Sequence, residues 1–380
     1  MAEQKNLTVL QLLPALESGG VERGTLEIAQ ALVVRGHRAL VISAGGRLVA
    51  PLVASGAEHF AWPIGAKSFK TLLLVRRLRR FLAEQKVDIL HARSRVPAWI
   101  AYLAWRGMNP ATRPRFVTTV HGMYGVNRYS RIMTRGEAVI AVSDTVRDYI
   151  VQNYPGTQPE RIRVIHRGVE GRVYPHGWKP DPAWQNTFLA QFPNAMGKLI
   201  LTLPGRITRL KGHEDFIELI ARLKRRGLGV HGLIAGGASA SKQRYLQKLR
   251  YRVRSMGLEA DISFTGQRDD LKNILAISSL VLSLSTQPES FGRTTLEALR
   301  LGVPTAGYDH GGVGEILRTV YPDGLLPLGR LDEACQHIAQ LLQQPAAVPA
   351  GDFFPLQAML DQTVGLYEQL ARATTRQAVI

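Results

Sequence analysis

The stretch Gln287-Pro-Glu-Ser-Phe-Gly-Arg-Thr-Thr-Leu-Glu-Ala-Leu-Arg300 carries two carboxylates, Glu289 and Glu297, on either side of Phe291-Gly292. An apolar run over Leu280–Leu284 precedes it, so the pattern predicts a strand, a short loop and a helix. A glycine loop that leads into a helix offers free backbone N–H groups and a positive dipole end to an anion. We expect Glu289 in the loop and Glu297 roughly two turns into the helix, where each can meet a different part of one ligand.

The same strand–loop–helix order recurs along all 380 residues. Short apolar runs predict strands over 7–13, 38–43, 87–91, 115–120, 138–142 and 163–165, and then over 198–203, 230–235, 262–264, 280–284 and 305–307. Helical spacing of apolar residues predicts helices over 21–34, 67–85, 97–105, 145–153, 212–226, 241–256, 269–276 and 356–374. This alternation is typical of an α/β protein with doubly wound, Rossmann-like sheets.

The length and one aperiodic segment divide the chain into two domains. Residues 171–193 are rich in Pro, Gly and Trp and predict the connection between them. We therefore expect a first domain over 1–172 and a second over 173–357, with a helix in 358–380 that returns to the first domain.

Composition restricts the environment and the partners. The single cysteine, Cys335, excludes an internal disulfide framework and a cysteine-based zinc site, which fits a reducing, cytoplasmic compartment. The polar N-terminus predicts no signal peptide, and the absence of about 18 consecutive apolar residues predicts no membrane span. The net charge of +18 predicts a polyanionic partner: a phosphorylated substrate, an anionic membrane or nucleic acid.

Two motifs in the first domain follow strand ends. Ser18-Gly19-Gly20 lies between the first strand and first helix, where paired glycines let a phosphate or sugar approach the backbone; a tight turn is the alternative. Its spacing differs from the Gly-x-Gly-x-x-Gly of dinucleotide-binding proteins, which argues against NAD. His121, at another strand end, either contacts a substrate oxygen or is structural.

A basic loop follows the first strand of the second domain. It contains Gly205, Arg206 and Lys211, and an Arg and a Lys in one loop can clamp a diphosphate; a solvated basic loop is the alternative. Glycines also follow later strands, at Gly236 and Gly266. The histidines are not spaced as metal ligands, Asp269-Asp270 is interpreted as a helix cap, and we expect no metal.

The segment Lys67–Phe81 mixes aliphatic residues with six basic ones. It predicts a basic amphipathic helix suited to an anionic membrane surface. A surface helix that packs on the sheet with a solvated basic face is the alternative.

Taken in order, these pieces resemble the retaining glycosyltransferases of family 4, over essentially the whole chain. The resemblance rests on the Gly19-Gly20 loop, on Val164–Glu170, on the Arg206/Lys211 loop and, most specifically, on Glu289-Ser-Phe-Gly-Arg-Thr-Thr-Leu-Glu297. It implies the GT-B fold, in which two Rossmann-like domains face a central cleft. The chain departs from the family pattern at His166-Arg167, where the family has Pro-Asn.

The resemblance also implies roles for individual residues. Arg206 and Lys211 would bind the diphosphate, Glu289 the donor sugar, and Glu297 the ribose. His121 would lie near the donor sugar, Gly20 would approach the diphosphate, and the Gly266-Gln267-Arg268 loop would meet the base. The remaining donor-site positions are Gly19, Gly205, Gly236, Phe291, Gly292, Arg293 and Thr294.

The activity implied by the resemblance is metal-independent, retaining transfer from a nucleotide-sugar, a UDP-sugar being favoured and a GDP-sugar possible. The acceptor would be a lipid-linked or lipopolysaccharide-type glycan at the inner face of the bacterial cytoplasmic membrane, with Lys67–Phe81 on the membrane. Two alternatives stay open: a basic nucleic-acid-binding protein, which would have no use for Glu289 and Glu297, and a nucleotide-sugar epimerase on the same fold.

Overall fold

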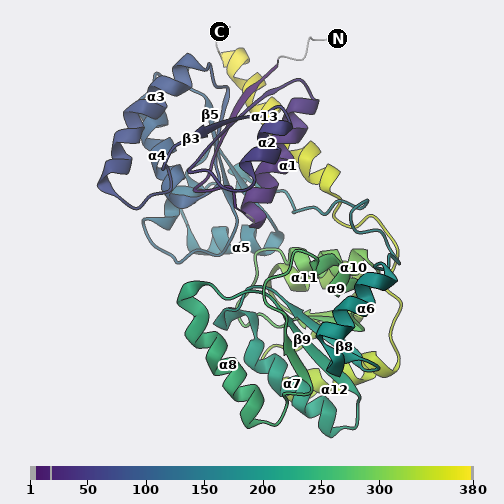
Figure 1. Cartoon of the computed structure of the whole chain (residues 1–380). Helices are drawn as coiled ribbons and strands as arrows, with labels where there is room; N and C mark the ends of the chain where they lie inside the picture. Colours follow the sequence, from purple (N-terminus) through teal and green to yellow (C-terminus); the bar gives the residue numbers. More distant parts are fainter. Residues whose placement is uncertain (1–5, 18, 378–380) are drawn as a thin grey trace. The chain divides into compact units, whose positions relative to one another are not determined.

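The computed structural model describes residues 6–17 and 19–377, which form two compact units (Figure 1). The first comprises the described residues of Met1–Arg167 and Leu356–Ile380, and the second is Gly168–Pro355. The first unit ends at Arg167 and resumes at Leu356, so both observed boundaries lie slightly before the expected boundaries at 172/173 and 357/358. Ser18 of the glycine motif, the N-terminal residues 1–5 and the end of the returning segment, 378–380, lie outside the described residues.

The first unit is built on a seven-stranded parallel sheet of order β3-β2-β1-β4-β5-β6-β7. Its strands are β1 Thr8–Leu12, β2 Arg38–Ser43, β3 Glu58–Ala61, β4 Ile89–Ala92, β5 Arg115–Val120, β6 Ala138–Ala141 and β7 Ile162–Val164. The predicted strands are thus present, and β3, with the helix before it, is an addition. The strand order reverses between β1 and β4, and open α/β sheets bind ligands at such a point.

Helices cover both faces of this sheet because successive residues of each buried strand point to opposite sides. In β1, Leu10 and Leu12 join one core, and Val9 joins the other. The helices are α1 Gly20–Val34, α2 Val49–Ala54, α3 Leu74–Glu84, α4 Arg95–Arg106, α5 Asp144–Asn153 and α13 Leu356–Gln377, with short 3-10 turns η1 Phe69–Leu73, η2 Ser130–Thr134 and η3 Pro159–Arg161. Ser143 caps α5, because its hydroxyl accepts a hydrogen bond from the Val146 N–H.

The last helix, α13, belongs to the first unit although the second unit precedes it in the chain. Figure 1 shows it (yellow) beside α1 (purple). Its Val364 and Tyr367 are fully buried in the core that Ile28 and Leu32 of α1 share. The returning helix predicted from the sequence is therefore confirmed for the described part of that segment.

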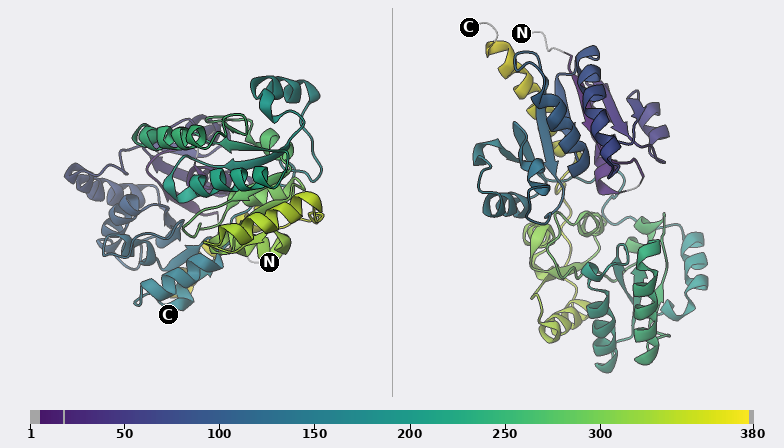
Figure 2. Two further views of the ribbon diagram at one scale, coloured as in Figure 1. Left: turned by 90° about the horizontal axis from the view of Figure 1, so that it is seen from below. Right: turned by 90° about the vertical axis from the view of Figure 1, so that its left-hand side faces the viewer.

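The second unit has a six-stranded parallel sheet of order β10-β9-β8-β11-β12-β13. Its strands are β8 Leu199–Pro204, β9 Val230–Ala235, β10 Ile262–Phe264, β11 Leu280–Ser283, β12 Thr305–Tyr308 and β13 Leu325–Leu326. Its helices are α6 Pro182–Gln191, α7 His213–Arg225, α8 Gln243–Ser255, α9 Leu271–Ala276, α10 Arg293–Arg300, α11 Gly311–Val320 and α12 Leu331–Gln343, with 3-10 turns η4 Pro193–Ala195, η5 Arg209–Lys211, η6 Ala240–Lys242 and η7 Pro322–Gly324 (Figure 2). The order reverses between β8 and β11.

Two expectations need correction. The connection predicted as aperiodic over 171–193 contains α6, whose Trp184 and Phe188 stack on each other. The single helix predicted over 67–85 is instead η1 followed by α3, and the apolar side chains of α3 pack on the sheet. Among the residues that the structure describes, no helix has the length and apolar character needed to cross a membrane.

Candidate functional site

The loops that carry the predicted donor residues meet at the strand reversal of the second unit. Strands β8 and β11 are hydrogen-bonded neighbours, so the loops after them lie at one edge of the sheet. The first loop carries Gly205, Arg206 and Lys211, and the second carries Glu289.

The two loops are joined by an ion pair. Lys211 Nζ lies 2.7 Å from Glu289 Oε1, and the Ser285 hydroxyl donates to the same oxygen. A cavity of about 20 Å³ beside the pair is lined by both residues and by Gly292 and Thr294. The ammonium group of Lys211, for which the resemblance implies a diphosphate, is thus paired with a carboxylate.

The ionised form of Glu289 is stabilised by its neighbours. Burial alone would raise the pKa of this carboxyl, but the charge of Lys211 and the hydrogen bonds from Lys211 and Ser285 outweigh it and hold the pKa below its usual value. Glu289 is therefore a carboxylate at neutral pH and has no proton to give as a general acid.

Two hydrogen bonds to backbone carbonyls, one from a backbone N–H and one from a side chain, fix the shape of the Glu289 loop. The Gly312 N–H at the start of α11 donates to the Glu289 carbonyl at 2.8 Å, and His310 Nε2 lies 2.6 Å from the Ser285 carbonyl. Gly292, the N-cap of α10, has φ of +96°, which disfavours residues with a Cβ. The turn at Phe291-Gly292 directs the N-terminus of α10 toward the loop.

Glu297 is the fifth residue of α10, about one turn into the helix and not the two turns expected. The helix begins at Arg293, so Phe291 and Gly292 belong to the loop. Glu297 is 6% exposed, and Arg293 Nε donates to its Oε1 at 3.1 Å. The side chain of Arg293, which we expected at the donor site, thus orients Glu297.

Arg206 is exposed, next to Gly205 at the end of β8. Gly236 follows the neighbouring strand β9, and the Gly205 N–H donates to the carbonyl of the preceding Ala235 at 2.9 Å. Gly205, Arg206 and Gly236 therefore lie together at the carboxyl edge of the sheet, as the strand ends predict.

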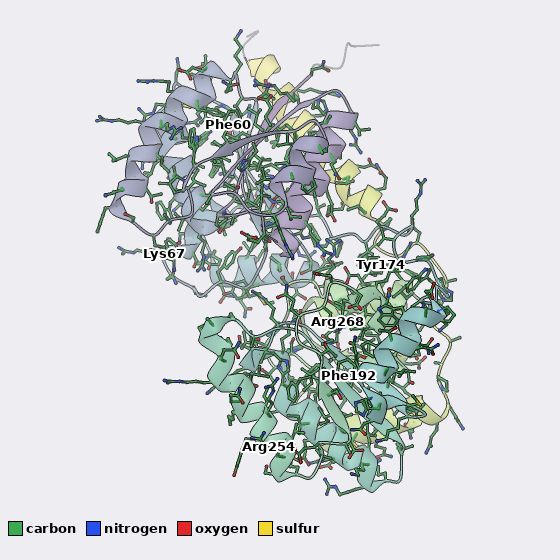
Figure 3. All side chains as sticks on the ribbon, in the orientation of Figure 1. Phe60, Lys67, Tyr174, Phe192, Arg254 and Arg268 are labelled. Atoms are coloured by element: carbon green, nitrogen blue, oxygen red, sulfur yellow. The ribbon has the colours of Figure 1, made fainter. Side chains whose placement is uncertain are left out.

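The Gly266-Gln267-Arg268 loop follows the outer strand β10. Arg268, labelled in Figure 3, donates through Nε and Nη2 to the two Asp270 oxygens at 2.8 and 2.5 Å. Trp184 Nε1 donates to the same carboxylate. Asp270 was expected to cap α9, but its side chain makes no cap hydrogen bond because Arg268 and Trp184 occupy it.

In the first unit, the predicted residues surround the N-terminus of α1. Gly19 is its N-cap and Gly20 its first residue. A Cβ at Gly20 would meet no atom within 4 Å, so the described residues leave space there for a ligand. His121 follows β5 directly, as predicted for a strand end.

Arg167 connects His121 to this glycine loop. Its Nη2 donates to the Gly20 carbonyl at 2.9 Å and lies 3.3 Å from His121 Nδ1. A guanidinium has no acceptor, so Nδ1 accepts and the neutral ring carries its proton on Nε2. Burial, and then the charges of Arg167 and Arg93, lower the His121 pKa well below its usual value, so the ring is neutral.

His121 Nε2 is a buried atom without a hydrogen-bond partner among the described residues. It borders a cavity of about 10 Å³, roughly the size of one water. Together with its tautomer, this makes Nε2–H a free donor. It can donate to a water in this cavity and is not suited to accept a proton.

Sequence reasoning missed a buried polar cluster beneath this site. Arg93, 2% exposed, donates to Gln11 Oε1 at 2.9 Å. His91 bonds Tyr367 of α13 and Thr119, at 2.6 and 2.7 Å, which gives it a structural role. Gln11 within an apolar strand and Arg93 directly after another were the available signals.

Comparisons with protein families cover most of the chain. Residues 18–171 match the model described as Glycosyltransferase Family 4, and residues 185–349 match Glycosyl transferases group 1. The chain is 25% identical over 283 residues to N-acetyl-alpha-D-glucosaminyl L-malate synthase of Bacillus anthracis, which covers 72% of this chain and 70% of that protein. It is 31% identical over 184 residues to mannosylfructose-phosphate synthase of Agrobacterium fabrum, 47% of this chain and 38% of that protein.

Solved structures share the two-sheet architecture. A glycosyltransferase from Rickettsia africae ESF-5 has a TM-score of 0.79 and 27% identity, covering 96% of this chain and 98% of that one. Anabaena HepE, solved with UDP and glucose, has a TM-score of 0.76 and 22% identity, covering 98% and 100%. The fold predicted from the sequence, GT-B with two α/β domains, is confirmed.

Proposed function

The chain belongs to the family 4 glycosyltransferases, and from the paired loops at β8 and β11 we propose that it transfers a sugar from a nucleotide-sugar with retention of configuration. A UDP-sugar is the favoured donor and a GDP-sugar the next. The observation that carries the proposal is the position of Lys211, 2.7 Å from Glu289, at the strand reversal of the second unit.

The chemistry requires a leaving group whose charge is neutralised as the sugar–phosphate bond breaks. Lys211 supplies a point charge and the exposed Arg206 a planar fork, so the two take the place that a metal ion has in other transferases. The departing diphosphate accepts the acceptor's proton, so no protein nucleophile is used. The proposed transfer therefore needs no metal ion.

The carboxylates orient the donor. Glu289, ionised and held by Ser285, accepts hydrogen bonds from the donor sugar once the diphosphate takes over Lys211. Glu297, oriented by Arg293, accepts from the ribose hydroxyls. The base meets the loop at Gly266–Arg268, mainly through its backbone, because Asp270 already engages the Arg268 guanidinium.

The first unit contributes a hydrogen-bond donor to a water that fits the small cavity beside His121. His121 presents Nε2–H while Arg167 occupies its other nitrogen. The pKa of His121 lies well below the usual value because the ring is buried near two arginines. The ring therefore stays neutral and keeps its Nε2–H as a donor across the working pH range.

A basic and apolar surface on the first unit supports a lipid-linked or lipopolysaccharide-type acceptor. Phe69, Leu72 and Leu73 of η1 are 92%, 51% and 73% exposed. Burying each would contribute about 1.5–3 kcal/mol, and each basic residue beside an anionic surface about 1 kcal/mol. We place this surface, Lys67–Phe81, on the inner face of the bacterial cytoplasmic membrane.

The structure changes which residues of Lys67–Phe81 are expected to contact the membrane. Leu78, Phe81 and Leu82 of α3 are buried against the sheet, so the apolar face of α3 is already used. The exposed apolar residues come from η1, and α3 contributes its arginines. The amphipathic surface is thus made by two consecutive segments.

A small polar acceptor is a second candidate, favoured by the names of relatives that make malate and fructose-phosphate glycosides. The two acceptor classes differ in their need for η1. Replacing Phe69 with Asp should abolish transfer to a glycolipid in vesicles and leave transfer to a soluble acceptor intact.

The decisive experiment is a thermal-shift panel of UDP, GDP, ADP and their sugars. One nucleotide should raise the melting temperature, and Glu297→Ala should reduce that increase; stabilisation by none contradicts the proposal. Incubating UDP-GlcNAc without acceptor separates an epimerase from a transferase. Salt-sensitive DNA or RNA binding, unchanged in Glu289→Gln and Glu297→Ala, would favour the nucleic-acid alternative.

A further inference from the structure

A groove of about 470 Å³ opens on the first unit between η1 and α4. Its apolar lining comes from Leu72 of η1 and from Val96, Trp99 and Ile100 of α4. Trp99 Nε1 donates to the Tyr129 carbonyl at 3.0 Å, which satisfies the one polar atom of the indole. The remaining ring surface of Trp99 is available as lining for an apolar ligand.

The mouth of the groove is basic. Lys67, labelled in Figure 3, and Ser68 line its rim, and Lys70 follows on the same turn. The sequence from Lys67 to Ala83 holds no acidic residue. An apolar interior behind a cationic rim matches a molecule that has a hydrocarbon chain and an anionic head.

The exposed side chains beside the groove indicate how a lipid of a bilayer would reach the groove. Phe69 and Leu73 are more exposed than Leu72, which lines the groove. When Phe69 and Leu73 enter the headgroup region of a bilayer, the mouth of the groove faces the lipid chains.

We propose that this groove binds a hydrocarbon chain of an anionic membrane lipid, with the lipid phosphate against Lys67. The inference rests on the membrane contact proposed above and goes beyond it, because surface adsorption needs no groove. A chain inside the groove fixes the position and rotation of the first unit on the bilayer. Its carboxyl sheet edge then keeps one orientation toward acceptors in the membrane.

Trp99 allows a direct test. Purified full-length protein is sedimented with phosphatidylglycerol vesicles whose acyl chains carry bromine, a short-range quencher, and with unbrominated vesicles as reference. We expect bound wild-type protein to lose emission that bound Trp99→Phe protein does not lose. Trp62 and Trp105 are buried, at 4% and 9% exposure, and contribute little to the difference.

Two leucines of η1 provide a matched pair of variants. Leu72→Asp puts a charge into the groove, whereas Leu73→Asp puts the same charge on the same turn outside it. Both should weaken sedimentation. Per bound molecule, bromine quenching should fall to the Trp99→Phe level in Leu72→Asp and stay at the wild-type level in Leu73→Asp, with far-UV circular dichroism confirming that both fold.

The outcomes separate the two proposals. Sedimentation without bromine quenching, or equal quenching in both leucine variants, overturns the groove and leaves the membrane contact standing. No sedimentation with anionic vesicles overturns both, while the nucleotide panel still tests the transferase. A dimer in sedimentation equilibrium that Leu72→Asp but not Leu73→Asp dissociates assigns the groove to a second copy and also overturns it.

Discussion

Replacing Glu289 with Gln should tighten the binding of UDP while it lowers turnover. Lys211 Nζ lies 2.7 Å from the Glu289 carboxylate, so a diphosphate that binds Lys211 must compete with this carboxylate for the cation. The two side chains are 31% and 23% exposed, which places the pair between surface and interior. Gln keeps the shape of the Glu289 side chain. Because it carries no charge, it neither competes with the diphosphate for Lys211 nor repels the diphosphate.

The magnitude follows from Coulomb's law. Two unit charges about 4 Å apart interact by about 4 kcal/mol at an effective dielectric of about 20, and partial solvent exposure reduces this. We expect a gain of about 1–2 kcal/mol, or roughly 5–30-fold in the UDP dissociation constant. Lys211→Met should lose about 1.5–3 kcal/mol, the contribution of a hydrogen bond to a charged group.

Isothermal titration calorimetry with UDP measures the four proteins of the double-mutant cycle. In the Lys211→Met background, Glu289→Gln should increase the UDP affinity by less than it does in the wild type. The reason is that the Lys211 cation, for which the carboxylate competes with UDP, is absent. Glu218→Gln, which breaks the 2.9 Å pair with Arg222 on α7, is the matched control and should leave UDP affinity unchanged. Weaker UDP binding in Glu289→Gln would refute the reasoning, since Glu289 would then be a binding group and not a competitor.

The same pair sets a dependence of stability on pH. The folded-state pKa of Glu289 lies below its ordinary 4.5, so its stabilising contribution is present above that value and is lost as the pH falls through the folded pKa. Thermal melts from pH 7 down to the acid limit should show a smaller loss for Glu289→Gln than for the wild type. An equal loss would mean that the pair does not stabilise the fold.

Three further predictions concern other parts of the site. Glu297→Ala should weaken UDP by about 1.5–3 kcal/mol in calorimetry, because a buried acceptor for the ribose is lost; an unchanged affinity contradicts the assigned role. Gly20→Ala should impair turnover without loss of stability in denaturant melts, because its Cβ would meet no described protein atom within 4 Å and would instead occupy the space proposed for the diphosphate; unchanged turnover contradicts that placement. Arg167→Met should raise the His121 pKa toward its ordinary value and change the Nε2–H tautomer in histidine-labelled NMR spectra, with exposed Arg161→Met as control; spectra identical to the wild type would exclude the proposed link.

The sequence predicts the position of the two loops after β8 and β11, because the order of strands in a parallel sheet decides which loops become neighbours. Apolar runs at 198–203 and 280–284 identify β8 and β11, and the parallel order brings the residues after them together. Glu289 and Lys211 are 78 positions apart, yet both follow strand ends. The parallel pairing of β8 with β11 is sufficient to predict that Glu289 and Lys211 lie close together.

Contacts set by side-chain geometry were not predictable in the same way. The Arg167–His121 contact joins residues 46 positions apart that share no periodic pattern. Arg268 was assigned to the base, while the structure directs its fork to Asp270, two residues away. Helix α6 was missed although Trp184, Phe188 and Phe192 recur at helical spacing, because the surrounding prolines and glycines predict a loop.

The return of α13 to the first unit has a consequence for how the protein is made. During synthesis, residues up to Arg167 emerge long before Leu356, and the second unit lies between. Until α13 arrives, the core that receives Val364 and Tyr367 stays open, and His91 lacks its phenolic partner. At about 5–20 residues per second the ribosome leaves that face uncovered for roughly 10–40 seconds, so the first unit, although begun first, is completed last. A chain released early would expose an apolar sheet face, which makes premature termination a route to aggregation.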